Sequence, residues 1–226
     1  MLVISGRVIP MFTANGTATK KVDNLPLLEA ICIISSVLIS LFYVSGIVYL
    51  IPESLSEYSS KLIGMLFFIA GSANAIRALR WQIWVTLKTP LVWSLHIAYW
   101  FIPFGFCGFA LHYWGFNISK SAALHCLTVG AMGSLALAMI SRVSLGHTGR
   151  MLKAKPIMTL AFGLISLAGI ARIISSTSFL TNTIFGFSLT QVFLIFSGIL
   201  WMSAYAIFVF QYSPALMSFR VDGKSG

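Results

Sequence analysis

Acidic residues are scarce in this 226-residue sequence, which has five Asp and Glu against fifteen Lys and Arg. Charged residues make up 9% of the chain, well below the roughly 25% of an ordinary soluble domain. Hydrophobic residues make up 58%, and a water-soluble fold of this size could not hide so much apolar surface. The composition therefore excludes a soluble domain and predicts a protein whose main partner is the lipid bilayer.

Motifs for several kinds of chemistry are also missing. The three cysteines, Cys32, Cys107 and Cys126, lie in apolar stretches without CxxC spacing, which argues against a disulfide framework or a zinc knuckle. The sequence has no HExxH motif, phosphate loop or nucleophile elbow. The net charge of +10 is scattered between apolar runs rather than gathered with aromatic residues, so no nucleic-acid partner is predicted.

Six apolar runs are long enough to cross about 30 Å of hydrocarbon as helices. None alternates with the period of two that a membrane-spanning strand would show. We therefore predict an all-α polytopic bundle of about six transmembrane helices. The runs are Leu27–Leu50, Leu62–Trp84, Leu91–Trp114, Ala122–Val143, Ile157–Ile174 and Phe185–Phe210.

The basic residues predict the orientation of the bundle. Most lie before the first run, around the second-to-third or fourth-to-fifth connection, or in the tail; Lys61, Lys120 and Arg172 are the exceptions. By the positive-inside rule both termini are cytoplasmic, in agreement with an even number of spans. The expected segments are a cytoplasmic region 1–26, which looks like the clipped end of a preceding helix, a six-helix domain 27–212 and a cytoplasmic tail 213–226.

Histidine is the main candidate for chemistry, because ionisable groups inside a membrane are expensive and usually functional. His96 shares a helical stripe with Trp93 and Trp100 in the third run. It is either a neutral ring bonded to a neighbouring helix or a ligand of haem or copper. His125 begins a face that continues with Met132 and Met139, a combination that suits copper, although methionine also fills packed interiors.

The remaining candidates lie nearer the predicted membrane surfaces. His147 stands between glycines in a loop where Arg142 and Arg150 could bind an anion such as a haem propionate, or the loop is simply solvated. His112, beside two aromatic residues, is expected to be an interfacial residue without a site. Arg77 and Arg80 either reach the headgroup layer or bind an anionic group, and Glu29 is expected at the interface.

Helix geometry separates two of the histidines. At 1.5 Å per residue, His96 and His125 should lie roughly 15 Å apart along the membrane normal. They cannot then be the two axial ligands of one iron atom. Any metal chemistry needs two levels, with His96 and His147 near the cytoplasm and His125 near the outer surface.

Three motifs resemble one protein family, the NnrS family. They are Gly6–Thr13, Trp93–Trp100, and the stretch from His125 to Gly133 that runs on through Met139–Arg150. The resemblance implies a multi-pass protein of the bacterial inner membrane that contains haem and copper and takes part in nitric-oxide metabolism or resistance to nitrosative stress. It implies His96, His125 and His147 as metal ligands and Arg7 and Arg142 as charged partners, with His96 and the two arginines holding the haem.

The resemblance covers what looks like the C-terminal half of the family's length. Three alternatives follow: the chain is a fragment, a degraded reading frame, or a split-gene subunit whose second chain supplies the missing N-terminal half and further histidines. Two other functions stay open at this level. One is a small-solute permease whose third run, bent at Pro103, lines a path, although no internal repeat supports it. The other is a non-catalytic partner subunit of a membrane complex.

Overall fold

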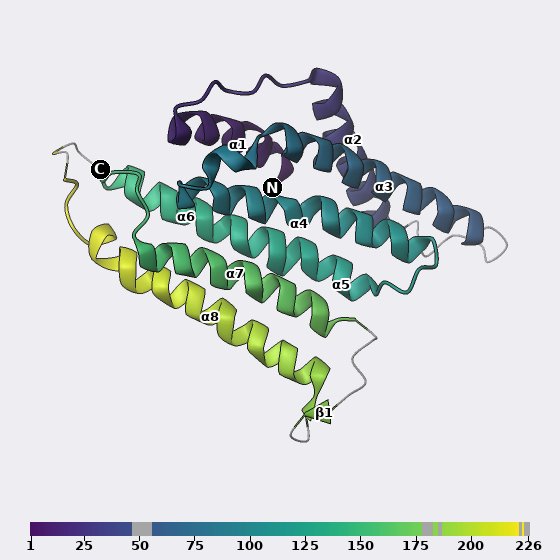
Figure 1. The fold of residues 1–226 in the computed structure, drawn as a ribbon. Coiled ribbons are helices and arrows are strands. Elements are labelled where there is room, and N and C mark those ends of the chain that lie inside the picture. Colours follow the sequence, from purple (N-terminus) through teal and green to yellow (C-terminus); the bar gives the residue numbers. More distant parts are fainter. Residues whose placement is uncertain (47–55, 178–182, 185–186, 222, 224–226) are drawn as a thin grey trace.

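The computed structural model describes residues 1–46, 56–177, 183–184, 187–221 and 223. These residues form a bundle of long helices (Figure 1). Two short strands, β1 and β2, pair antiparallel just before the last helix. The elements are α1 Leu2–Thr17, α2 Pro26–Val44, α3 Ser56–Arg80, η3 Ile83–Thr86, α4 Pro90–Tyr113, α5 Lys120–His125, η4 Cys126–Gly133, α6 Ser134–His147, α7 Pro156–Ser175, β1 Thr183–Ile184, β2 Phe187–Ser188 and α8 Leu189–Leu216.

In the part of the chain that the structure describes, six helical segments are long and apolar enough to cross a membrane, which confirms the predicted number of spans. The fourth is continuous through α5, η4 and α6. The third span, α4, begins with Pro90 and ends at Tyr113, close to the predicted Leu91–Trp114. The predicted ends at Leu50 and Phe185 lie outside the described residues. The cytoplasmic assignment of the termini and of segments 1–26 and 213–226 stays a prediction.

Local sequence explains several helix boundaries. Proline stands in the first turn of α2, α4 and α7, where its missing N–H costs no hydrogen bond. Ser188 and Gln191 form a capping box at the start of α8. The helix α3 ends at Arg80, four residues earlier than predicted, because Gln82 adopts a left-handed backbone with φ of 57° before the short helix η3.

The central element of the bundle is α4 (Figure 1). It contacts α1 and α3 as well as η4, α6 and α7, and most of its side chains are buried. By contrast, α8 packs mainly along α7 and exposes most of its apolar residues. Membrane helices with such exposed apolar surface face lipid. The polar groups available for a site are therefore concentrated around α4.

Contacts between connections define the two ends of the bundle. Thr89 donates to the Gly16 carbonyl, and Arg80 donates to the Asp23 carbonyl. The backbone N–H of Val221 donates to the Thr148 carbonyl. Together with a cavity between residues 88–91 and 152–159, these contacts bring residues 16–23, 80–90, 148–156 and 214–221 to one end. We call it the basic end.

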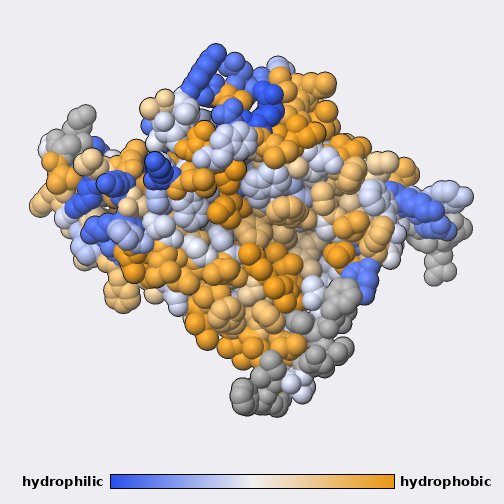
Figure 2. Space-filling view, in the orientation of Figure 1, coloured by the Kyte–Doolittle hydropathy of each residue, from blue (hydrophilic) through white to orange (hydrophobic). Residues whose placement is uncertain are grey.

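The opposite end of the bundle contains the other connections. Trp114 donates to the carbonyl of Lys61, and Ser119 donates to the carbonyl of Ser176. Figure 2 shows hydrophilic residues mainly at the ends and the upper edge of the molecule, with hydrophobic residues between them. This distribution is the one expected of a membrane-spanning bundle.

Candidate functional site

His96 is buried at the interface between α4 and α1. Its ring is 1% exposed, and its Nε2 atom forms a 2.8 Å hydrogen bond with the Thr13 hydroxyl. The Trp81 indole packs against the ring, with centroids 6.3 Å apart and planes at 85°. The Nδ1 atom is buried and has no hydrogen-bond partner among the described residues. One nitrogen of the imidazole is thus fixed by Thr13, and the other is buried and unpaired there.

His125 ends α5 at the point where the helix changes to π-type hydrogen bonding in η4. Its Nδ1 atom is also buried without a partner, although the residue as a whole is half-buried. The positive charge of Arg172 on α7 disfavours a second positive charge on the His125 ring. One-turn π segments inside helices occur often at functional sites because they change the direction of nearby side chains.

The π-type segment lies against α7 at a contact between two glycines. An added Cβ atom at Gly169 would lie 2.8 Å from the Gly130 Cα atom, and one at Gly130 would overlap the Phe101 ring. The Cys126 thiol donates to the Phe101 carbonyl over 3.1 Å. Glycine at both positions therefore permits the close approach of η4, α4 and α7 that sets the position of His125.

The other predicted ligand and charged partners lie elsewhere. His147 is exposed at the end of α6, and Arg7 is exposed on α1. Arg142 is buried, with its guanidinium carbon 3.8 Å from the centroid of the Phe12 ring. Within the described ranges, no group of three or more His, Cys, Asp and Glu side chains could hold a metal ion. The structure thus places Arg142 near α1 but does not gather the three histidines.

His112 has a structural contact. Its Nδ1–H group donates to the Ile118 carbonyl over 2.9 Å and so holds the turn between α4 and α5. The ring also packs edge-on against Tyr113. The residue thus holds a turn at the opposite end of the bundle.

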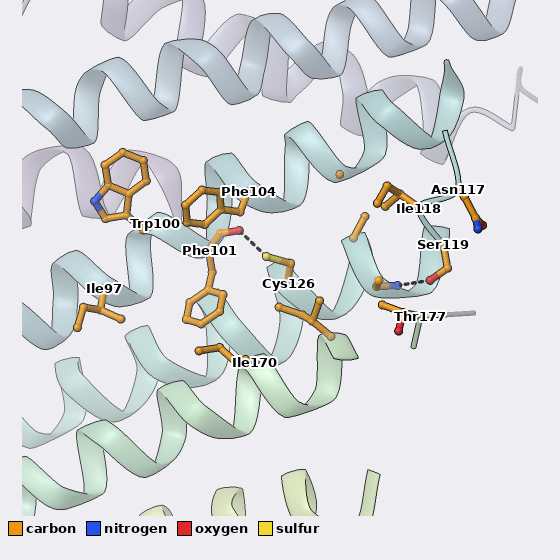
Figure 3. Close-up of a pocket in the computed structure, with 14 residues that line it drawn as sticks. Ile97, Trp100, Phe101, Phe104, Asn117, Ile118, Ser119, Cys126, Ile170 and Thr177 are labelled. Atoms are coloured by element: carbon orange, nitrogen blue, oxygen red, sulfur yellow. Dashed lines mark hydrogen bonds between the residues drawn. The ribbon is translucent and has the colours of Figure 1, made fainter. Parts of the chain in front are cut away.

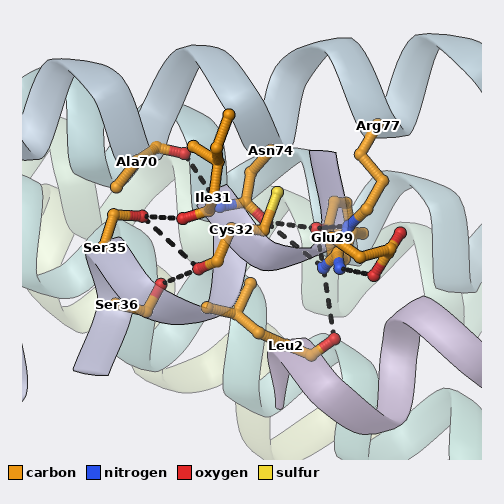
Figure 4. Close-up of polar contacts among 10 residues, drawn as sticks. Leu2, Glu29, Ile31, Cys32, Ser35, Ser36, Ala70, Asn74 and Arg77 are labelled. Carbon is orange, nitrogen blue, oxygen red and sulfur yellow. Dashed lines mark hydrogen bonds and ion pairs between the residues drawn. The ribbon is translucent and has the colours of Figure 1, made fainter. Parts of the chain in front are cut away.

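A buried polar cluster joins α1, α2, α3 and α4 (Figure 4). Arg77 is 1% exposed and donates to the Glu29 carboxylate over 2.7 Å. The same guanidinium donates to the Tyr99 hydroxyl, the Asn74 side chain and, over 3.1 Å, the Leu2 carbonyl. Tyr99 in turn donates to Asn74 over 2.5 Å. We call these four residues, Glu29, Asn74, Arg77 and Tyr99, the arginine cluster.

The arginine cluster decides between the two alternatives that the sequence left open for Arg77. Arg77 does not extend to the headgroup layer; it binds an anionic group, and that group is Glu29 of the same chain. Gly6 permits this, because an added Cβ atom there would lie 2.8 Å from Arg77 Nη1. The cluster also reaches the neighbourhood of His96, since Trp81 packs on Tyr99 with centroids 4.5 Å apart and also on the histidine.

Sequence reasoning missed Thr13, Asn74 and Tyr99 as members of these sites. A signal for Thr13 was present, because Gly6, Ile9 and Thr13 recur at helical spacing and form the buried face of α1. No comparable signal marks Asn74 and Tyr99. The sequence equally allows their partner, Arg77, to extend its side chain to the membrane surface.

A cavity of about 470 Å³ lies between α4, α5 and α7 (Figure 3). Trp100, Phe104 and Ile170 line its apolar part, and Asn117 and Thr177 lie toward the opposite end of the bundle. Phe104 is 61% exposed, so the cavity opens sideways toward lipid. None of the three histidines predicted as ligands lines it. Such an enclosure suits a small apolar molecule that is dissolved in the membrane.

Comparisons with known proteins give one match. The family model described as NnrS protein matches residues 1–220, nearly the whole chain. No curated protein and no solved structure matches it. The match does not test which part of a longer family member the chain represents.

Proposed function

This chain belongs to the NnrS family, and from that premise we propose that it is a haem- and copper-binding protein of the bacterial inner membrane that acts in the response to nitric oxide. His96 and His125 each supply one imidazole ligand, at two separate positions in the bundle. A bound haem or copper supplies a metal centre that can take nitric oxide as a ligand. This chain's own residues position the rings and keep water away from them.

The observation that carries the proposal is the state of the two buried imidazoles. Each has an Nδ1 atom that is buried and without a partner. Leaving a buried polar atom unpaired costs about 1–3 kcal/mol, so such an atom usually has a partner in the functional state. Neutral imidazole nitrogen is a common ligand of iron and copper. The two residues therefore fit single-ligand positions.

Thr13 selects the ligand atom of His96 in this proposal. When the Nε2–H group donates to the Thr13 hydroxyl, Nδ1 carries the lone pair that a metal needs. Trp81 and the packed face of α1 then hold the ring in one orientation. Thr13 is thus a positioning residue rather than a ligand.

The described residues do not fit a complete copper site, because they bring no three donors together. We propose that the missing donors come from a second chain. His147 remains a candidate metal ligand, and Arg7 and Arg142 remain candidates to bind the haem. Arg142 has the best-defined position, since Phe12 holds its guanidinium and no carboxylate forms an ion pair with it among the described residues.

A spectroscopic measurement tests the metal sites. The chain is isolated in detergent from membranes of its own host, supplied with haem and copper, together with any second chain bound to it, and it is measured for a Soret band and copper content. We expect a Soret band that shifts when nitric oxide is added, and reduced haem or copper in His96→Gln and His125→Gln. His112→Gln is the matched control and should bind as the original chain does. A purified chain with neither Soret band nor copper contradicts the proposal.

The second chain needs its own test. An affinity-tagged chain is isolated from membranes of its own host after mild crosslinking. We expect a crosslinked species heavier than the 24.7 kDa chain that contains a different, histidine-bearing polypeptide. Recovery of the chain alone, with full haem and copper content, would exclude a second chain as the source of ligands.

A further inference from the structure

We propose that the basic end of this protein binds the headgroup of an anionic phospholipid in two adjacent cavities around the α6–α7 connection. This site is separate from the histidines and does not depend on the metal-binding function. The residues that form it are Lys88, Arg150, Lys153 and Lys155. We call them the basic rim.

The two cavities share one wall. The first, of about 560 Å³, lies between the α6–α7 connection and the end of α8, and Arg150, Lys153 and Lys155 line it. The second, of about 580 Å³, lies between that connection and the start of α4, and Lys88 and Lys153 line it. Because Lys153 lines both, the cationic surface is continuous from one cavity to the next.

The wall of the first cavity is built by contacts that are distant in sequence. Arg150 donates to the Ala215 carbonyl over 3.3 Å and to the Ser218 hydroxyl over 2.9 Å. Gly149 turns the chain with φ of 69°, a backbone conformation that favours glycine. The arginine is therefore held against the end of α8 rather than free in solvent.

Charge in this region is unbalanced. Among the described residues, no Asp or Glu side chain lines either cavity. The salt bridges between described residues are Glu57–Lys61 and Glu29–Arg77, and neither involves the basic rim. These four cations, which form no ion pair with a described Asp or Glu, produce a positive potential that attracts an anion from the membrane surface.

Exposed apolar side chains next to these cations favour a lipid over a soluble phosphate. Met151 and Phe210 line the first cavity and are 83% and 81% exposed, and Leu152 lines the second. A soluble anion would not cover such surfaces, whereas a phospholipid places its phosphate among the cations and its acyl chains along the apolar groups. The lipid-facing helix α8 continues from the same cavity into the membrane.

Native mass spectrometry of the purified full chain tests this site. The chain is titrated with dioleoylphosphatidylglycerol and, separately, with the zwitterionic dioleoylphosphatidylcholine. We expect adducts of the anionic lipid in clear excess. In Lys153→Gln/Lys155→Gln the apparent affinity should fall about fivefold per cation removed, which corresponds to about 1 kcal/mol each.

The control removes the same charge elsewhere. Lys61→Gln/Lys120→Gln takes two cations from the opposite end and should leave binding of the anionic lipid unchanged. Lys153→Arg/Lys155→Arg keeps the charge and should restore binding, which separates a lost site from a misfolded chain. Equal binding by the Lys153→Gln/Lys155→Gln variant and the original chain, or an equal loss in the control, would overturn the proposal.

A competition arm distinguishes the lipid from soluble phosphate. Millimolar inorganic phosphate is added to the lipid-bound chain at constant ionic strength. We expect the phosphatidylglycerol adduct to persist. Displacement by inorganic phosphate, with the same dependence on Lys153 and Lys155, would assign the site to a soluble anion and reject the lipid.

Discussion

The two halves of the bundle are held together in different ways. In α1–α4, buried side chains bond to one another across helices, as in the arginine cluster and the Thr13–His96 pair. In α5–α8, hydrogen bonds between helices run from hydroxyls to backbone carbonyls, such as Ser197 to Ala168 and Tyr205 to Gly133, and Gly130 meets Gly169. Glycine permits close approach in both halves, as at Gly71 in α3, but the network of buried polar side chains around Arg77 belongs to the first half.

The difference matters because lipid offers no hydrophobic force between helices. A membrane bundle must therefore use hydrogen bonds, dispersion contacts between small residues, or both. Among the described residues, each half of this protein has one histidine whose buried Nδ1 atom has no partner. Each of these histidines is held by the kind of contact found in its own half. His96 is fixed by a hydrogen bond, whereas His125 is set by the π-type segment and the glycine contact.

The largest expected effect comes from disrupting the arginine cluster in α1–α4. Arg77→Met leaves the Glu29 carboxylate without its partner and removes donors from Tyr99, Asn74 and the Leu2 carbonyl. We expect a loss of about 3 kcal/mol in the free energy of unfolding, measured by denaturant titration in detergent. Arg80→Met, at a more exposed arginine of the same helix, is the control and should change stability little. The double variant Arg77→Met/Glu29→Leu should recover part of the loss, and equal loss in both would contradict the ion-pair explanation.

The next largest effect is expected at the glycine contact of η4. Gly130→Ala places a Cβ atom into the Phe101 ring and forces α4 and η4 apart, at an expected cost of about 1–3 kcal/mol. Gly163→Ala on α7 is the matched control, because no described atom outside the adjoining helix backbone lies within 4 Å of its added Cβ. The control should be neutral or slightly stabilising, since alanine favours a helix over glycine. Thermal unfolding in detergent gives the comparison, and equal midpoints for the two variants would show that the glycine contact does not hold the half together.

A smaller effect is expected at a single hydrogen bond, between Thr13 and His96. Thr13→Val keeps the shape of the side chain but loses the hydroxyl that bonds His96, so we expect a loss of about 1 kcal/mol in stability. Thr13→Ser keeps the hydroxyl and should lose less. The Soret band of the haem-loaded chain should also change in Thr13→Val and not in Thr13→Ser. Matching spectra for the two variants would mean that Thr13 does not select the ligand atom.

The smallest effect is expected where the two halves are joined. His112→Leu removes the bond to the Ile118 carbonyl in the turn between α4 and α5. Because the ring is partly exposed, water can replace it, and we expect about 0.5 kcal/mol. Haem and copper content should be unchanged. A loss as large as that of Gly130→Ala would show that the turn, rather than packing, fixes the second half.

Sequence patterns predicted the helices well because apolar length and proline position are local properties. The α4 boundaries follow from Pro90 and from the apolar run after it. The early end of α3 could not be predicted, because nothing in the sequence marks Gln82 as left-handed. The π-type hydrogen bonding of η4 was equally unforeseen, since it depends on contacts with α4 and α7.

The candidate sites were only partly predictable. His96 and Arg77 stood out as ionisable residues in apolar runs, but their partners come from helices distant in sequence. Arg77 and Glu29 are 48 residues apart, and His96 and Thr13 are 83 apart. Helix periodicity shows which residues share a face, but it does not show which faces meet. The Gly6–Thr13 motif could have indicated that α1 packs closely, but not that α4 is its neighbour.

The arginine cluster also constrains how the chain can enter the membrane. An arginine within an isolated spanning helix costs about 2.5–3.5 kcal/mol during insertion. Glu29 precedes Arg77 in the chain, so its carboxylate is already present when α3 is synthesised, whereas Tyr99 follows 22 residues later. The order of the helices therefore supplies the counter-ion first and the hydrogen bonds to Tyr99 afterward. Exchanging the acid and the base would send an unpaired arginine into the bilayer ahead of its partner.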